Sequence, residues 1–449
     1  MSARTRGPGV RELVAATPEG RERCVDLLRA VAILAVVVGH WLLVVIVSRD
    51  GELTGTSVLA LWRPAHLINW VFQVMPVFFF VGGYASTASW TSARRAGTDG
   101  LAWLGGRVRR LLDPTTAFLV IVVAAAATAR LAGVDPELVR LAGWLMGIHL
   151  WFLAVYVALV ALTPLVVRAH ERSGLWLPLG LAVLAALVDL LRLGGELTAL
   201  GVLNFGLVWL CVFALGVAWR GGSLPGPRWL APGLATGGIV AVVTLVALGP
   251  YPLSMVNVPG AELQNTAPPS LALLALGLAQ IGLVLVARRT LNRLAHRSAV
   301  WVATVAVNGT IMSIFLWHLV AAVLAGLLLH GTGIYPQPPP VSGAWFALRP
   351  VWIAVCTLLL AVLVLLVARF ERVSSVAGPG VGDTPVRVSL TVVGLIGCCA
   401  GLVVLTRGGL STDGPAGIPV TGLVPYLAGF AAVTAATRER IVPPLSRRT

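Results

Sequence analysis

Lysine is absent from this chain, and charged residues of any kind are scarce. Of its 449 residues, 33 are basic and 18 are acidic, so charged residues make up 11% against 57% hydrophobic ones. A soluble domain carries about 25% charged residues, and this composition therefore excludes an ordinary soluble protein. A disordered chain needs low hydrophobicity and is excluded as well.

Cysteines are few, odd in number and without ligand spacing. The five cysteines form no CxxC or Cys/His pattern, so the sequence predicts neither a disulfide framework nor a zinc site. P-loop, GxSxG, HExxH and EF-hand patterns are missing too. We therefore expect no metal and no permanently bound cofactor.

Long apolar runs dominate what is present, and they predict an all-α, polytopic transmembrane helix bundle. A helix crosses the hydrocarbon core with about 20 apolar residues. The polar stretch 1–23 precedes a first run that is too long for a signal peptide and is interpreted as a retained span. Twelve candidate spans lie near 25–47, 67–88, 114–133, 143–167, 175–193, 198–218, 229–249, 269–287, 301–328, 345–368, 389–406 and 418–436.

The arginines indicate how these spans are oriented. With twelve spans and a cytoplasmic N-terminus, 26 arginines fall on the cytoplasmic side and seven fall at or near the outer side. The positive-inside rule therefore predicts a multi-pass protein of the cell membrane with both termini in the cytoplasm. Nucleic acid is not an expected partner, because the arginines are scattered between apolar runs and form no basic domain.

The first span carries three polar residues in one column. Asp26 and Arg29 are three residues apart, which allows them to pair on one helix face. Arg29 and His40 are eleven apart, so both point the same way, about 16 Å apart along the axis. Polar groups at membrane depth are costly and are functional candidates, and an imidazole can act as a general base. Read singly, Arg29 is also explained as an interfacial residue and His40 as a structural histidine.

A second basic element follows span 2. Leu101–Leu112 is expected to form a short amphipathic helix at the membrane interface. It projects Arg107 and Arg110 together, and two guanidinium groups suit the binding of phosphate oxygens. Topology-setting charge and binding of anionic lipid headgroups explain the same residues equally well.

The remaining polar features have simple packing explanations when each is taken alone. Gly82 and Gly83 permit close approach of helices. Asp189 and Arg192 are expected to neutralise each other, and Asn204 and Gln280 are expected to form interhelical hydrogen bonds.

Taken in order, however, the motifs resemble those of the membrane acyltransferase-3 family. Each element is weak alone, but five in the family's order cover about residues 20–370. They are Arg29-X10-His40, Phe79-Phe80-Val-Gly82-Gly83-Tyr84, Arg107-x-x-Arg110, His149-Leu-Trp151-Phe152-Leu and Phe315-Leu-Trp317-His318. The family's serine before Gly-Tyr is Gly82 here, and the acidic residues expected near Tyr156 are missing.

The resemblance implies a division of the chain. A cytoplasmic tail at 1–23 would precede an acyltransferase-3-like transmembrane domain of ten spans at 24–370. A cytoplasmic linker at 371–388, two additional spans at 389–436 and a cytoplasmic tail at 437–449 would follow.

The resemblance also implies an O-acyltransferase. Acyl-CoA, with acetyl-CoA as the default donor, would be held by Arg107 and Arg110 on the cytoplasmic side. An acyl group would pass to a hydroxyl of an extracytoplasmic carbohydrate or a lipid-linked acceptor. The catalytic group would consist of His40, Arg29 and Asp26, although Asp26 is too far from His40 for direct contact. Residues expected to line the acceptor site or a tunnel are His149, Trp151, Tyr84, Trp317 and His318.

Two other functions remain open. Twelve spans with intramembrane charges also suit a transporter or flippase of a lipid-linked or small-molecule substrate, although the two halves show no matching repeat. A membrane scaffold without chemistry would leave the column of Arg29 and His40 unexplained.

Overall fold

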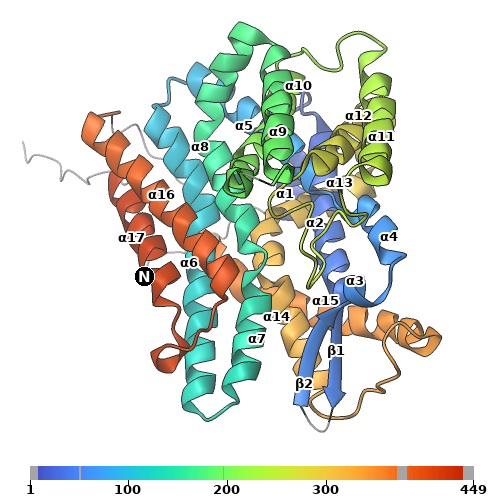
Figure 1. Cartoon of the computed structure of the whole chain (residues 1–449). Helices are drawn as coiled ribbons and strands as arrows, with labels where there is room; N and C mark the ends of the chain where they lie inside the picture. The colour runs from blue at the N-terminus through green and yellow to red at the C-terminus, as the bar shows by residue number, and fades with distance from the viewer. Residues whose placement is uncertain (1–8, 50–51, 196, 372–381, 438–449) are drawn as a thin grey trace, which may run out of the picture. The chain divides into compact units, whose positions relative to one another are not determined.

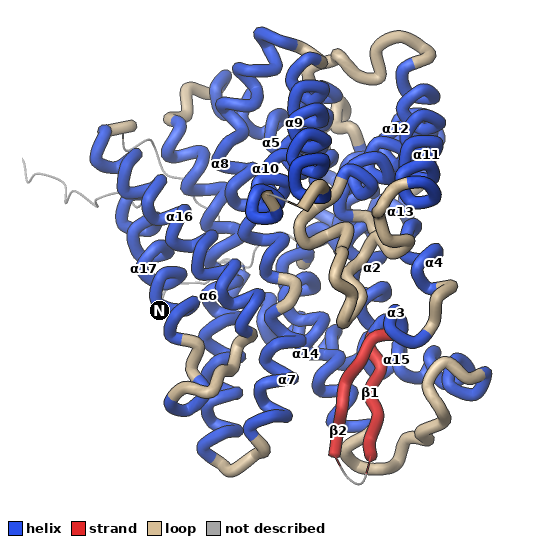
Figure 2. Tube along the Cα trace, viewed as in Figure 1, coloured by secondary structure: helices blue, strands red, loops and turns tan. Residues whose placement is uncertain are grey.

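The computed structural model describes residues 9–49, 52–195, 197–371 and 382–437, and most of them are helical. Twelve helical segments are long and apolar enough to cross a membrane. This confirms the prediction of an all-α polytopic bundle. Within the described residues, Figure 2 shows strands only in one hairpin.

The chain divides into two compact units, and each is described by itself. Unit 1 combines Met1–Ala88 with Leu162–Arg369. The elements that lie wholly or partly in it are α1 (Val10–Ala15), α2 (Arg23–Leu43), β1 (Val44–Arg49), β2 (Glu52–Ser57), α3 (Val58–Leu61), α4 (Ala65–Phe72), α5 (Met75–Arg95), α8 (Leu150–Ser173), α9 (Trp176–Leu193), η1 (Thr198–Leu203), α10 (Asn204–Arg220), α11 (Leu230–Leu248), α12 (Leu271–Ala295), α13 (Ser298–Gly309), α14 (Ile311–Leu329) and α15 (Gly343–Glu371).

Unit 2 combines Ser89–Ala161 with Phe370–Thr449, so the division falls inside α5 and α8 and near the end of α15. Its other elements are α6 (Gly100–Leu131), α7 (Pro136–Gly147), α16 (Pro385–Gly408), η2 (Pro415–Gly417) and α17 (Val420–Thr437). In Figure 1 the two C-terminal helices α16 and α17 lie side by side, and their glycines allow the close approach. A Cβ atom at Gly401 would lie 2.6 Å from the carbonyl oxygen of Gly422.

The predicted division of the chain into tails, domain and linker stays a prediction. Most of the predicted linker 371–388 and all but the first residue of the predicted C-terminal tail 437–449 lie outside the described residues. In the predicted N-terminal tail, the short helix α1 is described, and Thr17 just beyond it accepts a hydrogen bond from the indole of Trp301 in α13.

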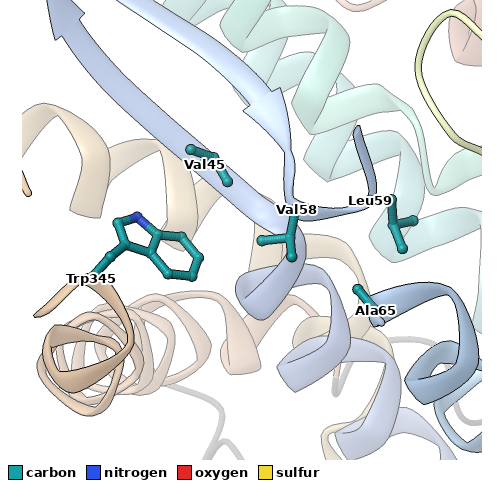
Figure 3. Packing of buried hydrophobic residues seen from close by; sticks show 5 residues of the cluster. All are labelled: Val45, Val58, Leu59, Ala65 and Trp345. Atoms are coloured by element: carbon teal, nitrogen blue, oxygen red, sulfur yellow. The ribbon is translucent and has the colours of Figure 1, made fainter. Parts of the chain in front are cut away.

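The first span is shorter than predicted because its C-terminal part is a strand. Helix α2 ends at Leu43, and the β-branched run Val44–Val47 enters β1 (Figure 1). β1 pairs antiparallel with β2, with Val44 opposite Ser57. The hairpin packs through a small apolar cluster, shown in Figure 3, that joins Val45, Val58, Leu59, Ala65 and Trp345.

Two predicted continuous spans in unit 1 are interrupted helices. Between α4 and α5, residues 73 and 74 leave the helix, and Pro76 lies in the first turn of α5, where proline is tolerated. Between α13 and α14, Thr310 breaks the helix directly after Gly309. Such interruptions free backbone groups and side chains at membrane depth.

Close helix contacts hold unit 1 together, as Gly83 was predicted to allow. A Cβ atom at Gly83 in α5 would lie 2.1 Å from the carbonyl oxygen of Phe213 in α10. A Cβ atom at Gly216 would lie 1.9 Å from the carbonyl oxygen of Phe80. The two helices therefore touch backbone to backbone.

A buried polar network ties the loop before α12 to the bundle. Asp189 is fully buried and pairs with Arg192 at 2.9 Å, as predicted. It also accepts hydrogen bonds from Asn204, from the Tyr251 hydroxyl and from the backbone of Leu271. The predicted interhelical bonds of Gln280 are present as well, to the carbonyls of Trp70 and Gln73.

Candidate active site

Helix α2 carries the column of polar residues predicted from the sequence. It begins at Arg23 and ends where the amide of Val44 donates to the carbonyl of His40. His40 therefore lies in the last turn of α2, and Asp26 and Arg29 lie in its first two turns. Asp26 and His40 are fourteen residues apart, about 21 Å along the axis, so they make no direct contact.

A second histidine meets His40 in unit 1. Nδ1 of His40 lies 2.8 Å from Nε2 of His318 in α14, and the ring centroids are 5.1 Å apart at 11°. His318 is fully buried, whereas His40 remains partly accessible. The sequence placed His318 only among residues lining an acceptor site or tunnel, and the structure makes it the direct partner of His40.

The hydrogen bonds of His318 define which nitrogen of His40 is basic. A carbonyl only accepts, so the 2.7 Å contact between Nδ1 of His318 and the Phe315 carbonyl requires a hydrogen on that Nδ1. Nε2 of neutral His318 is then an acceptor, and His40 donates to it from Nδ1. Neutral His40 consequently has its lone pair on Nε2, the geometry of a general base supported by a second imidazole.

Two tryptophans fix this pair. The indole of Trp41 donates to the carbonyl of His318 at 2.8 Å, and the indole of Trp352 in α15 donates to the carbonyl of Trp41 at 2.9 Å. Both indoles are nearly fully buried. These bonds join the backbones of α2 and α14 and the Trp352 side chain of α15 around the histidine pair. The rings themselves are held by the contact between them and by the bond of His318 to the Phe315 carbonyl.

The predicted pairing of Asp26 with Arg29 is wrong. Asp26 instead binds Arg21 bidentately, at 2.6 and 2.8 Å, because Arg21 lies in the turn just before α2 and reaches the first turn. Arg29 is half-buried, and its Nε has no hydrogen-bond partner among the described residues. Arg29 therefore keeps an uncommitted donor on the face of α2 that the sequence indicated.

An ion-pair cluster at the start of α2 was not foreseen from the sequence. The carboxylate of Glu22 accepts hydrogen bonds from Arg288 and Asn292, both in α12. Burial alone would raise the pKa of this carboxyl, but the hydrogen bonds it accepts, chiefly from Arg288, hold the pKa below its ordinary value. The signal available in the sequence was only a glutamate preceding a membrane span.

The same region contains Tyr84, another predicted lining residue. Its ring lies 4.7 Å from the ring of Trp219, and the guanidinium of Arg220 lies 5.9 Å over it. Arg288 lies 5.8 Å over Trp219. Tyr84 thus belongs to an aromatic and cationic group joined to Glu22 through Arg288.

The other residues predicted for the site lie in unit 2, except Trp317, which precedes His318 in unit 1. Arg107 and Arg110 are on α6, which continues without a break to Leu131, so 101–112 is not a separate interfacial helix. His149 is buried at the break between α7 and α8, with its ring 5.9 Å from Phe118, and Trp151 lies in the first turn of α8. Trp317 is buried in α14 directly before His318.

The sequence of the chain was compared with models of known protein families, with curated proteins and with solved structures. The model of a family described as an acyltransferase domain, the acyltransferase-3 family, matches residues 22–369. The chain belongs to this family. The match covers the first ten candidate spans of this acyltransferase, which leaves α16 and α17 outside it. Comparison with curated proteins gives no match, and comparison with solved structures gives none.

Family membership confirms the resemblance seen in the sequence motifs. The protein is a polytopic membrane acyltransferase that transfers groups other than aminoacyl groups. The sequence lacks the acidic residues that the family resemblance predicts near Tyr156, which raises the question of which residue pairs with His40 in this acyltransferase. In the structure, the ring that contacts His40 is His318, which is itself bonded to a backbone carbonyl.

Proposed function

We propose that this acyltransferase moves an acyl group, acetyl by default, from acyl-CoA to a hydroxyl of an extracytoplasmic carbohydrate or related acceptor. His40 is the general base. The observation that supports this role is the hydrogen-bonded chain from the Phe315 carbonyl through His318 to Nδ1 of His40. This chain leaves the lone pair of Nε2 available to a substrate.

The transfer step uses that lone pair. Nε2 of His40 takes the proton of the acceptor hydroxyl, and the hydroxyl oxygen forms a bond to the thioester carbonyl carbon. The C–S bond breaks, and the departing thiolate of CoA takes the proton back from His40. While His40 is protonated, its Nδ1–H bond to His318 is charge-assisted, which lowers the energy of that state. The same Nε2 also suits a covalent acyl-histidine route, in which it attacks the thioester first.

The donor is proposed to bind from the cytoplasm. Arg107 and Arg110 lie one turn apart on α6 and would bind the phosphates of CoA. Arg29 on α2 would stabilise negative charge in unit 1. The excess of arginine on one side supports a cytoplasmic position for both termini. His149, Trp151, Tyr84 and Trp317 are proposed to line the path of acceptor or donor, and Asp26 acts only by holding Arg21.

The test is a purified His40→Gln variant, compared with His170→Gln. His170 is a histidine of α8 whose ring nitrogens contact the Gly174 carbonyl and the Ser223 hydroxyl. In vesicles supplied with labelled acetyl-CoA, loss of the general base should lower acyl transfer by about 100-fold or more, because such catalysis contributes about 10²- to 10⁴-fold. The His170 variant should transfer normally.

Two outcomes would contradict the proposal. Full transfer by a folded His40→Gln variant would remove His40 from the reaction. Accumulation of substrate in the vesicles without turnover of acyl-CoA would instead identify a transporter.

A further inference from the structure

Unit 1 contains a cavity of about 210 Å³ beside the end of α2. Its walls come from the start of β1, from the proline-rich segment 335–340 and from the first turns of α15. The side chains that matter for its chemistry are His330, Tyr335, Trp345, Arg349 and Trp352. In the proposed topology it lies on the outer side, where an acceptor would arrive.

Arg349 gives the cavity a positive charge that no described carboxylate compensates. Its side chain is 9% exposed, and among the described residues no carboxylate lies within 4.0 Å of it. Nη2 donates to the carbonyl of Val44 at 2.8 Å, while Nε is buried without a partner in the described part of the chain. A buried guanidinium is costly unless an anion pairs with it, which points to a ligand that supplies one.

Aromatic rings form the walls around this charge. The guanidinium of Arg349 lies 3.5 Å over the ring of Trp345, which is held in the apolar cluster of Figure 3. The ring of His330 lies 5.2 Å from that of Tyr335 and 6.3 Å from that of Trp352, and its buried Nδ1 has no partner among the described residues. Flat aromatic faces beside unpaired polar atoms suit a sugar ring, whose C–H groups pack on the aromatic faces and whose hydroxyls hydrogen-bond the polar atoms.

The cavity is joined directly to the histidine pair. Arg349 donates to the carbonyl of Val44, and the amide of Val44 donates to the carbonyl of His40. Trp352, in the cavity wall, donates to the carbonyl of Trp41, whose own indole donates to His318. A ligand in this cavity would therefore lie next to the end of α2 that carries His40.

We propose that this cavity binds an acidic group, a carboxylate or a phosphate, on the sugar ring of the acceptor. Arg349 pairs with the acidic group, and the rings of Trp345 and Trp352 confine the sugar. The inference rests on the proposed acyl transfer and narrows its acceptor to an acidic carbohydrate. Burial, and then the charge of Arg349, lower the pKa of His330, so its ring stays neutral and is able to hydrogen-bond a hydroxyl.

Binding measured without acyl donor tests the site separately from the reaction. Calorimetric titration of the full chain in lipid nanodiscs would compare glucuronic acid, glucose 6-phosphate and glucose. We expect the carboxylate or the phosphate probe to bind about 10-fold more tightly than glucose or better, because charge-assisted pairs are the stronger ones. The better of the two acidic probes identifies which acidic group the site prefers.

Two arginine variants locate the effect. Arg349→Gln should abolish the preference for the acidic probes and leave glucose binding unchanged. Arg63→Gln removes the same charge from an exposed residue just before α4 and should bind like the unaltered protein. If Arg349→Gln does not fold, Arg349→Lys serves in its place. Lysine keeps the positive charge but cannot bind an acidic group bidentately, so this variant should retain a smaller preference for the acidic probes.

Three results would overturn the proposal: equal binding of glucose and both acids by the unaltered protein, no binding of either acid, or an Arg349→Gln variant that keeps the preference. The failure of acyl transfer would be a different result, because His40→Gln should lose transfer while still binding the acidic probes.

Discussion

The pairing of His40 with His318 predicts how strongly activity depends on the residue that hydrogen-bonds the proposed base. His318→Leu removes the acceptor of the 2.8 Å bond from His40 Nδ1. A hydrogen bond to a charged group contributes about 1.5–3 kcal/mol, and the bond is needed most when His40 is protonated. At about 1.36 kcal/mol per factor of ten, kcat should fall by about 10- to 200-fold.

A replacement series separates this role from simple packing. His318→Gln keeps an oxygen that is able to accept from His40 and should retain more activity than His318→Leu. His66→Leu provides a control, because Nε2 of this histidine of α4 hydrogen-bonds the carbonyl of Leu59 and not the histidine pair. The assay is initial rate of labelled acetyl transfer at varied donor concentration, with elution volume and thermal midpoint as checks of folding. KM for the donor should change little, since His318 stabilises the protonated base and not the bound donor.

The reasoning would be refuted by a folded His318→Leu variant with the kcat of the unaltered protein. It would be refuted equally if the leucine and glutamine variants lost the same activity, since packing alone would then explain the loss.

Two further predictions concern the polar groups that hold unit 1 together. Because folding lowers the pKa of Glu22, its contribution to stability is complete above its unfolded value of 4.5 and is lost as the pH falls through the lower folded value. Glu22→Gln should therefore flatten the loss of thermal stability between about pH 6 and pH 3, and an unchanged acid profile would contradict this. Asp189→Ala leaves Arg192 buried without its partner and should lower the free energy of unfolding by about 3–5 kcal/mol in denaturant titrations. The control is Glu262→Ala, which removes an exposed carboxylate in the loop before α12. It should change the free energy of unfolding by less than about 0.5 kcal/mol.

The spans were predictable because hydrophobic length alone determines them. Twelve apolar runs correspond to twelve candidate membrane helices, and the three-residue spacing of Asp189 and Arg192 correctly indicated their contact. The interruption at Thr310 was not predicted, although Asn308 and Gly309 precede it, because the apolar run resumes directly after Thr310 and no proline marks the break. The strand after Leu43 was missed for a related reason: β-branched residues suit a membrane helix as well as a strand.

Contacts between distant segments were the harder part of the site. The spacing along α2 would allow Asp26 to pair with Arg29. In the structure, Asp26 pairs instead with Arg21, which lies outside the predicted span. The motifs singled out both His40 and His318, yet 278 residues separate them, and periodicity carries no information on which helices become neighbours. Arg349 was counted only among the seven arginines at or near the outer side, although Trp345 and Trp352 lie four and three residues from it on the same helix. Its contact with the carbonyl of Val44 arises only when β1 and α15 meet.

The use of one imidazole to support another has an electrostatic consequence. A carboxylate in the place of His318 would bring a permanent negative charge into the membrane interior, at the desolvation cost of a buried ion. Two neutral rings ending on the Phe315 carbonyl carry no net charge between turnovers, so the proposed base would need no buried counter-ion. In the proposed mechanism, the two rings themselves carry a positive charge only while His40 holds the proton.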